Sequence, residues 1–323
     1  MGKKEVEKIK NNFLKKSSFL ILSHAKPDGD SVGSSVALAL LLKNLDKRVF
    51  LVFNDEIPKG LSFIYNFVEI SHTPPPISDI EAVAILDCVP ALTGFNKSHP
   101  WFFENLEPVV ELDHHEKDYS KNHIHYHSTE SSSTCELVWE LSNSMGWKIT
   151  KNIAESLLVG IYTDTNGFVN ENVTPKTLLA TADLIEKGAS SENVMKFLKS
   201  KTEKLLKAIA IVIERLKISK KSKIASTYLT NQDIEKMQAT RDDLAGISNF
   251  LSQLSDVNVT LFISEFEKGI IKGSLRSRGE EDVSRIARIF SPSGGGHKKA
   301  AGFSLPGTFV PSENGGWKLA SIN

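Results

Sequence analysis

Short apolar runs rich in branched residues recur through the first half of the chain. They cover residues 19–22, 49–53, 82–86 and 108–112. Between or after them come segments with apolar residues at helical spacing, most clearly over 32–44 and 151–162. Strands that alternate with helices indicate an α/β fold, with a mainly parallel sheet covered by helices on both faces. Ligands of such sheets bind beyond the carboxyl ends of the strands.

The pattern changes in the second half of the chain. Residues 191–218 carry a long helical pattern without Gly or Pro, as expected for a helix that links two domains. Beyond it, strand-like segments such as 223–229 and 270–277 alternate with helical patterns at 241–254 and 282–290. We therefore predict an N-terminal domain over 1–190, a helical linker over 191–218 and a smaller mixed α/β domain over 219–323.

Composition narrows the class of protein. A chain of 323 residues is longer than one hydrophobic core usually supports, so more than one domain is expected. Its 39 Lys or Arg residues balance 39 Asp or Glu residues. A neutral chain lacks the broad basic surface that holds long nucleic acid, so we expect no such partner. The longest apolar run, VALALLL, is far too short to span a membrane, and two cysteines form no disulfide framework. We expect a cytoplasmic protein without a membrane partner.

Four acidic or histidine-bearing motifs follow the predicted elements. They are His24, Asp28 and Asp30 after residues 19–22, Asp87 after 82–86, Asp113, His114 and His115 after 108–112, and Asp164 after 151–162. Taken alone, each motif can also be a turn, a helix cap or a polar loop. In a parallel sheet, however, the first three groups project from one edge. Carboxylates and imidazoles together suit Mn²⁺, Mg²⁺ or Zn²⁺, and the lack of paired cysteines argues against a structural zinc site.

A second group of candidate residues lies near the C-terminus. Between residues 268 and 299, eight Lys or Arg outnumber three Asp or Glu, which gives a local net charge of +5. The guanidinium groups suit phosphate, and the glycines would let backbone N–H groups approach an anion. The alternative is a flexible glycine loop beside solvated arginines. The candidates for substrate binding are Arg276, Arg278, Gly294, Gly295, Gly296 and His297.

The run HIHYH places His123, His125 and His127 on one face of a predicted strand. Three imidazoles on one face can bind a metal ion. A polar strand face is the favoured interpretation, and the metal site stays open as the alternative.

Together these motifs carry a family resemblance. In order, HAKPDGDSVGSS, ILDC, LDHH and YTDTNGF closely resemble the first four motifs of the DHH phosphoesterase superfamily. The run SGGGHKKAAGFSL resembles the signature of the DHHA1 domain. The resemblance spans residues 24–305 and is most similar to the nanoRNase group of stand-alone oligoribonucleases and phosphoadenosine-phosphate (PAP) phosphatases.

The resemblance implies an enzyme with two divalent metal ions, normally Mn²⁺, with Mg²⁺ as the alternative. It implies that His24, Asp28 and Asp87 hold one ion, and that Asp30, Asp87, His114 and Asp164 hold the other, with Asp87 bridging. Asp113 would support the ligands without touching an ion, and His115 would be a catalytic residue facing the substrate. The implied substrates are short RNA, linear dinucleotides and PAP. A homodimer stays open.

Two alternatives to this function also stay open. One is a phosphodiesterase dedicated to cyclic di-AMP or its linear product pApA. The other, of a different class, is a catalytically silent nucleotide-sensing module, which the intact set of metal-ligand types disfavours. A RecJ-like exonuclease on long DNA is disfavoured by the short, neutral chain, and a family II pyrophosphatase by the GGGH tail. One departure is the segment DCVPALTGF, which lacks the Arg that related enzymes often carry beyond Asp87.

Overall fold

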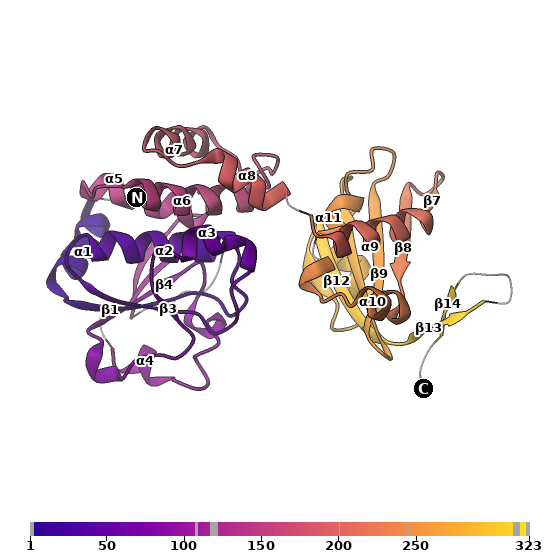
Figure 1. Ribbon diagram of the computed structural model, residues 1–323, viewed down its shortest axis with the longest axis horizontal. Coiled ribbons are helices and arrows are strands. Elements are labelled where there is room, and N and C mark those ends of the chain that lie inside the picture. The colour runs from indigo at the N-terminus through magenta and orange to yellow at the C-terminus, as the bar shows by residue number, and fades with distance from the viewer. Residues whose placement is uncertain are drawn as a thin grey trace. The chain divides into compact units, whose positions relative to one another are not determined.

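The computed structural model describes residues 3–106, 109–116, 122–199, 201–244, 246–312 and 317–320 (Figure 1). The chain divides into two compact units, residues 1–200 and residues 201–323, and each has its own hydrophobic core. Within the described residues, no helix has the length and apolar character needed to cross a membrane.

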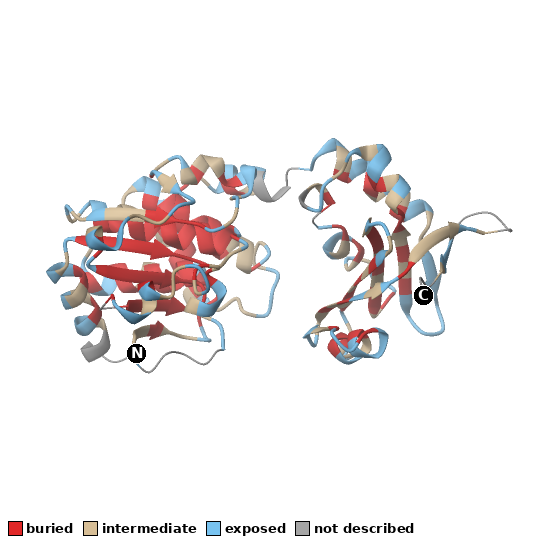
Figure 2. Ribbon diagram, turned by 90° about the horizontal axis from the view of Figure 1, so that it is seen from below, coloured by how far each residue is buried: buried red, intermediate tan, exposed pale blue. Residues whose placement is uncertain are grey.

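The first unit is built on a six-stranded sheet of order β3-β2-β1-β4-β5-β6, in which every neighbouring pair is parallel. Its strands are β1 (Ser18–Leu22), β2 (Arg48–Val52), β3 (Ile70–Ser71), β4 (Ala82–Leu86), β5 (Val109–Asp113) and β6 (Ile124–His127). All residues of β1, β4 and β5 are buried, which explains why their sequences are mostly apolar, with Glu111 and Asp113 as the charged residues of β5 (Figure 2). The strand order reverses between β1 and β4, which makes this junction the topological switch point of the sheet.

Helices cover the sheet of the first unit (Figure 1). One face carries α1 (Lys3–Lys15), α2 (Gly29–Lys43), α5 (Thr134–Met145) and α6 (Lys151–Asp164). α7 (Pro175–Glu186) and α8 (Ser191–Lys199) pack on α6. The opposite face is covered by α4 (Trp101–Glu104) and connecting segments, through Phe95, Phe102 and Leu106. The short elements η1 (Lys59–Leu61), α3 (Ser62–Tyr65), η2 (Ile77–Asp79) and η3 (Pro90–Leu92) lie in the connections.

The second unit is a mixed sheet of order β11-β12-β10-β9-β8-β7, in which only the β8–β9 pair is parallel. Its strands are β7 (Lys217–Ser219), β8 (Ile224–Leu229), β9 (Val259–Glu267), β10 (Ile270–Ser277), β11 (Gly295–His297) and β12 (Ala300–Pro306). α12 (Val283–Phe290) packs on one face. The other face carries α9 (Glu203–Glu214), α10 (Asn231–Met237), η4 (Asp242–Leu244) and α11 (Ile247–Leu251). A separate two-stranded sheet pairs β13 (Thr308–Pro311) with β14 (Trp317–Ala320).

The predicted fold class is confirmed in both units. The four apolar runs of the first half correspond to β1, β2, β4 and β5, and the HIHYH run forms β6. β3 has only two residues and carries no periodic signal, so the pattern did not predict it.

The stretch 191–218, predicted as one helical linker, is divided between the units. α8 lies in the first unit, whereas α9 lies in the second and buries Leu205, Ala208 and Val212 in its core. The interruption has a local cause, because the Thr202 hydroxyl caps α9 by accepting a hydrogen bond from Leu205 N at 3.1 Å. The division of the chain into two compact units therefore falls between α8 and α9.

Glycines allow α2 and α6 to pack in direct contact. A Cβ on Gly33 would lie 2.4 Å from the carbonyl oxygen of Ser156. A Cβ on Gly160 would lie 2.2 Å from Cys135 Sγ and 2.4 Å from Asp30 Oδ1. The two glycines therefore bring the start of α2, the end of α6 and the start of α5 together.

We predict that Gly33→Ala destabilises the first unit by about 1–3 kcal/mol, because the added methyl group overpacks a backbone contact. At an ordinary helical site the same change would stabilise by up to about 1 kcal/mol. Urea unfolding followed by circular dichroism measures the effect. The matched control is Ser144→Ala on the exposed side of α5, which should shift stability by less than about 0.5 kcal/mol. A stabilised Gly33→Ala variant would contradict the close packing.

Candidate metal centre

The ends of three adjacent strands place the first candidate residues. His24 follows β1, Asp87 follows β4, and His114 follows β5. Because β1 pairs with β4 and β4 with β5, all in parallel, the carboxyl ends of these strands lie at one edge. The predicted convergence of these motifs is therefore present in the structure.

The start of α2 places two further carboxylates. Asp28 caps the helix, and its Oδ1 accepts hydrogen bonds from the N–H groups of Asp30 (3.1 Å) and Ser31 (3.0 Å). Asp30 lies in the first turn and is fully buried. Asp164 reaches the same region from the last turn of α6.

The carboxylate of Asp87 lies between two groups of side chains. Its Oδ2 is 3.3 Å from Nε2 of His24, which in turn lies 3.7 Å from Asp28 Oδ1. Its Oδ1 is 3.6 Å from Nε2 of His114. The backbone of Asp87 has a φ of 62°, a region that non-glycine residues rarely adopt and that is enriched at functional sites. The two oxygens of one carboxylate thus face different ligand groups.

His114 is surrounded by carboxylates. Its Nε2 lies 3.1 Å from Asp164 Oδ2, 3.8 Å from Asp30 Oδ2 and 3.6 Å from Asp87 Oδ1. Three sets of side chains each bring one potential metal-ligand atom per residue within 4.8 Å of the others. They are His24 with Asp28 and Asp87, Asp30 with His114 and Asp164, and Asp87 with His114 and His115.

Crowding shifts the proton affinities of these groups. Burial disfavours the charged imidazole of His24, but hydrogen bonds and charge from Asp28 and Asp87 outweigh it and raise the pKa to about 10. For His114, burial is likewise outweighed by Asp164 and Asp30, and the pKa rises to about 9. Burial, with the charge of Asp87, raises the pKa of Asp30 well above its usual value. The cluster therefore holds more negative charge than it can keep without protons or cations.

The residues present fit divalent cations. Nε2 of His114 is buried and makes no hydrogen bond of good geometry within the described part of the chain, although oxygens of three carboxylates lie within 3.8 Å of it. An imidazole nitrogen left in this way is available to a metal ion. Carboxylates with imidazoles are the donor set of Mn²⁺ and Zn²⁺ sites, and a cation would offset the repulsion among the acids.

Asp113 and His115 form a pair beside this cluster. Asp113 is buried, and its Oδ1 accepts hydrogen bonds from the backbone N–H of His115 at 3.1 Å and from Nδ1 of its ring at 2.8 Å. The side chain of His115 is 46% exposed, and its Nδ1 also lies 3.5 Å from Asp87 Oδ1. The carboxylate thus fixes the ring of His115 at the border between the buried cluster and solvent.

Two residues that contact the cluster were missed by the sequence analysis. Thr134 N donates to Asp30 Oδ2 at 2.7 Å, and Cys135 N donates to Asp30 Oδ1 at 2.9 Å. The hydroxyl of Thr134 donates to Asp87 Oδ1 at 3.1 Å. The only local signal was the run SSSTCE, which is typical of a helix start, and Ser133 does cap α5.

Two of the residues predicted to bind phosphate, Arg276 and His297, lie in one row of paired positions across the sheet of the second unit. Arg276 on β10 pairs with Ala300 on β12, and Ala300 pairs with His297 on β11. Directly paired residues point to the same face, so Arg276 and His297 share a face with only a methyl group between them. Arg276 donates to Asn249 Oδ1 and to the carbonyl of Leu275, both at 3.0 Å and both uncharged. Burial lowers the pKa of its guanidinium.

Arg278 binds the chain itself. Its Nη1 donates to the carbonyl oxygens of Gln253 and Leu254 at 3.2 Å each. These bonds hold the segment after α11, and a role for Arg278 in substrate binding stays a prediction.

The fold itself requires glycine at two positions of the GGGH run. A Cβ on Gly294 would lie 2.4 Å from the carbonyl oxygen of Ala287, and its N–H donates to Ser291 O at 2.8 Å. Gly296 has a φ of 138°, and a Cβ there would lie 2.5 Å from Ala300 O. Of the three glycines, only Gly295 has open space at the position that a Cβ would take, with no neighbouring atom within 4 Å of it. Anion binding by the GGGH run stays a prediction.

The HIHYH run forms β6 and faces a buried carboxylate. Glu111 on β5 is fully buried, and its carboxylate contacts Nδ1 of His123 and lies 3.6 Å from Nδ1 of His125. Nε2 of His127 hydrogen-bonds to the carbonyl oxygen of His115 at 2.8 Å. Within the described residues these histidines are absent from the sets whose ligand atoms converge within 4.8 Å. The favoured interpretation, a polar strand face, agrees with these contacts.

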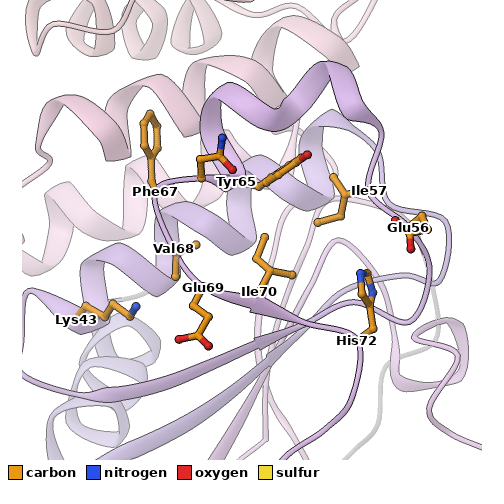
Figure 3. Close-up of a pocket in the computed structure, with 10 residues that line it drawn as sticks. Lys43, Glu56, Ile57, Tyr65, Phe67, Val68, Glu69, Ile70 and His72 are labelled. Atoms are coloured by element: carbon orange, nitrogen blue, oxygen red, sulfur yellow. The ribbon is translucent and has the colours of Figure 1, made fainter.

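A large cavity of the first unit lies apart from the cluster of potential metal ligands. A cavity of about 520 Å³ lies at the edge of the first sheet, between the end of α2, α3 and β3. Lys43, Tyr65, Glu69 and His72 line it, together with apolar side chains (Figure 3). None of the predicted site residues is part of its lining. The candidate metal centre is distinguished by the convergence of potential ligand atoms rather than by the size of a pocket.

Comparison with known proteins agrees with both units. Residues 18–161 match the DHH family, N-terminal domain, and residues 221–314 match the DHHA1 domain. The bifunctional oligoribonuclease and PAP phosphatase NrnA of Bacillus subtilis is 25% identical over 293 residues, which cover 89% of each chain. The cyclic-di-AMP phosphodiesterase GdpP of the same organism is 25% identical over 320 residues, which cover 94% of this chain and 47% of that protein.

A solved structure extends the similarity to three dimensions. The crystal structure of an exopolyphosphatase-related protein from Bacteroides fragilis is 25% identical, covers 94% of this chain and 91% of its own, and has a TM-score of 0.81. The family matches, the strand-end cluster and the two-unit fold agree with one another. The chain is therefore a DHH-family phosphoesterase composed of an N-terminal DHH domain followed by a DHHA1 domain.

Proposed function

We propose that this chain hydrolyses short oligoribonucleotides or linear dinucleotides to mononucleotides with two divalent cations, Mn²⁺ by preference, and that it also dephosphorylates PAP. The main support for the proposal is that the two oxygens of the Asp87 carboxylate face different groups of side chains. Its Oδ2 faces His24 and Asp28, and its Oδ1 faces His114. A carboxylate placed in this way is suited to bridge two cations, one held with His24 and Asp28, the other with Asp30, His114 and Asp164.

When bound, a pair of divalent cations supplies an acidic water and neutralises charge on a phosphoryl group. His115 has a separate role that its geometry supports. Because Asp113 accepts a hydrogen bond from Nδ1, that nitrogen carries the proton and Nε2 is the atom that exchanges a proton with substrate. The half-exposed ring can hydrogen-bond a phosphoryl oxygen or protonate the leaving oxygen.

The second unit carries its own candidate groups for binding phosphate. Arg276 is half-buried and its described hydrogen bonds go to uncharged oxygens, so its positive charge is available to an anion. His297 shares its row, and Lys272 and Ser274 line a cavity of about 250 Å³ beside it. This arrangement suits a substrate with few phosphates.

The relatives support this substrate class and one alternative. NrnA of Bacillus subtilis is named for short RNA and PAP and aligns over nearly its whole length. GdpP is named for cyclic di-AMP, and similarity to it keeps a phosphodiesterase for cyclic di-AMP or pApA as the second candidate. We also propose that the protein acts in the cytoplasm and that it can form a homodimer.

We predict that Asp87→Ala lowers kcat by more than about 100-fold, since the loss of a shared ligand exceeds the cost of losing an outer hydrogen-bond partner. It should also reduce bound Mn²⁺ at both sites, whereas Asp164→Ala should affect chiefly one. Metal analysis after gel filtration, together with steady-state kinetics, measures both effects.

The matched control for this prediction is Asp79→Ala, which removes a carboxylate that pairs with Arg48 on the surface of the same unit. It should keep the metal content and the activity. The metal assignment would be wrong if purified Asp87→Ala kept both as well.

We predict that kcat/KM falls steeply from dinucleotides to long single strands, because the neutral chain offers no continuous basic track. The salt dependence of binding should be shallow, since few phosphates are contacted. A 5′-labelled RNA ladder at two salt concentrations tests this, with Asp87→Ala as the inactive control. PAP, cyclic di-AMP and pyrophosphate in the same assay separate the alternatives.

Equal efficiency on long strands with a steep salt slope would instead favour a polymer exonuclease. Preference for cyclic di-AMP over every linear substrate would favour the second candidate. Absence of turnover on the whole panel by protein that binds Mn²⁺ would remove the proposed function.

A further inference from the structure

The start of α5 is joined to two carboxylates of the metal centre by three hydrogen bonds. Thr134 N and Cys135 N donate to the two oxygens of Asp30, at 2.7 and 2.9 Å. The hydroxyl of Thr134 donates to Oδ1 of Asp87 at 3.1 Å. Thr134 and Cys135 are fully buried, so these donors are shielded from competing water.

The hydroxyl of Thr134 acts on one particular oxygen of Asp87. That Oδ1 lies on the side of His114, whereas Oδ2 lies on the side of His24. Rotation of the carboxylate about its Cβ–Cγ bond would exchange the two oxygens, and a hydrogen bond to one of them opposes that rotation. Thr134 therefore gives the Asp87 carboxylate a hydrogen-bond donor and also fixes the plane of that carboxylate.

Thr134 is itself held in place by a buried network. Oε2 of Glu136 accepts hydrogen bonds from the backbone N–H (3.1 Å) and hydroxyl (2.6 Å) of Ser132, and from the hydroxyl of Thr177 at 2.9 Å. Nδ2 of Asn172 donates to the carbonyl oxygen of Ser132 at 2.8 Å. The segment before Thr134 thus cannot shift without breaking several buried hydrogen bonds.

We propose that Thr134 is a positioning residue of the metal centre, which holds the Asp87 carboxylate so that each of its oxygens faces a different cation. The inference rests on the proposed function, because it takes Asp87 as the shared ligand. Hydrogen-bond partners of metal ligands typically change metal affinity or activity by about 10- to 100-fold when they are removed. Thr134 has the contacts of such a partner although it touches no proposed cation.

Two variants test the hydroxyl alone. Thr134→Val keeps the shape of the side chain and the N–H that binds Asp30, but it removes the donor to Asp87. Thr134→Ser restores that donor. The matched control is Ser142→Ala on the same helix, where a buried hydroxyl donates to Val138 O at 2.7 Å and is remote in sequence from every proposed ligand.

Mn²⁺ binding by calorimetry, thermal unfolding of the metal-free protein and kcat are measured for the wild type and all three variants. Thr134→Val should bind Mn²⁺ about 10- to 100-fold more weakly and lose kcat by a similar factor, and Thr134→Ser should recover most of both. Ser142→Ala should leave Mn²⁺ affinity and kcat unchanged, because the lost hydroxyl bonds only to its own helix.

The inference would be overturned if Thr134→Val lowered the unfolding temperature but kept wild-type Mn²⁺ affinity. It would also be overturned if Thr134→Ser failed to recover the affinity. Mn²⁺ binding requires no substrate, so an inactive wild type would contradict the proposed function and leave this test intact.

Discussion

The stability of the first unit depends on how the repulsion among the carboxylates that surround His114 is offset. Asp30, Asp87 and Asp164 all lie within 3.8 Å of its Nε2, and Asp30 is fully buried. Acids brought this close in a low-dielectric site destabilise the fold unless protons or cations offset their charge. The raised pKa values of Asp30, Asp164, His24 and His114 all reflect this condition in the absence of cations. Divalent cations satisfy it without protonating the acids.

Backbone contacts hold these carboxylates close together. Gly33 and Gly160 let α2 and α6 touch, which brings Asp30 beside the start of α5. There, two N–H groups at the positive end of the helix dipole stabilise the Asp30 carboxylate. Asp87 is held in a rare backbone conformation between β4 and η3. Most of the groups that hold the proposed metal ligands are therefore backbone or small hydroxyl groups rather than large side chains.

Much of this could be predicted from sequence, for identifiable reasons. Strands buried on both faces are mostly apolar, so β1, β4 and β5 were predicted although Glu111 interrupts the apolar run of β5, and parallel pairing implied that Asp87 and His114 meet. Thr134 was not predicted because its partner Asp87 is 47 residues away, and nothing local marks a hydroxyl as part of a metal site. The break between α8 and α9 was missed because the helical pattern continues across it, although Thr202 marks the start of α9. Packing requires glycine at 294 and backbone conformation requires it at 296, while anion binding by these residues stays a prediction.

We propose above all that one carboxylate, that of Asp87, is a ligand of two cations. The most direct measurement is anomalous diffraction from crystals grown with Mn²⁺, recorded at the manganese absorption edge. We expect two peaks in the first unit, one beside His24 and Asp28 and one beside Asp30, His114 and Asp164, with a different oxygen of Asp87 directed at each. A single peak, or two peaks that leave Asp87 without contact to one of them, would contradict the proposal.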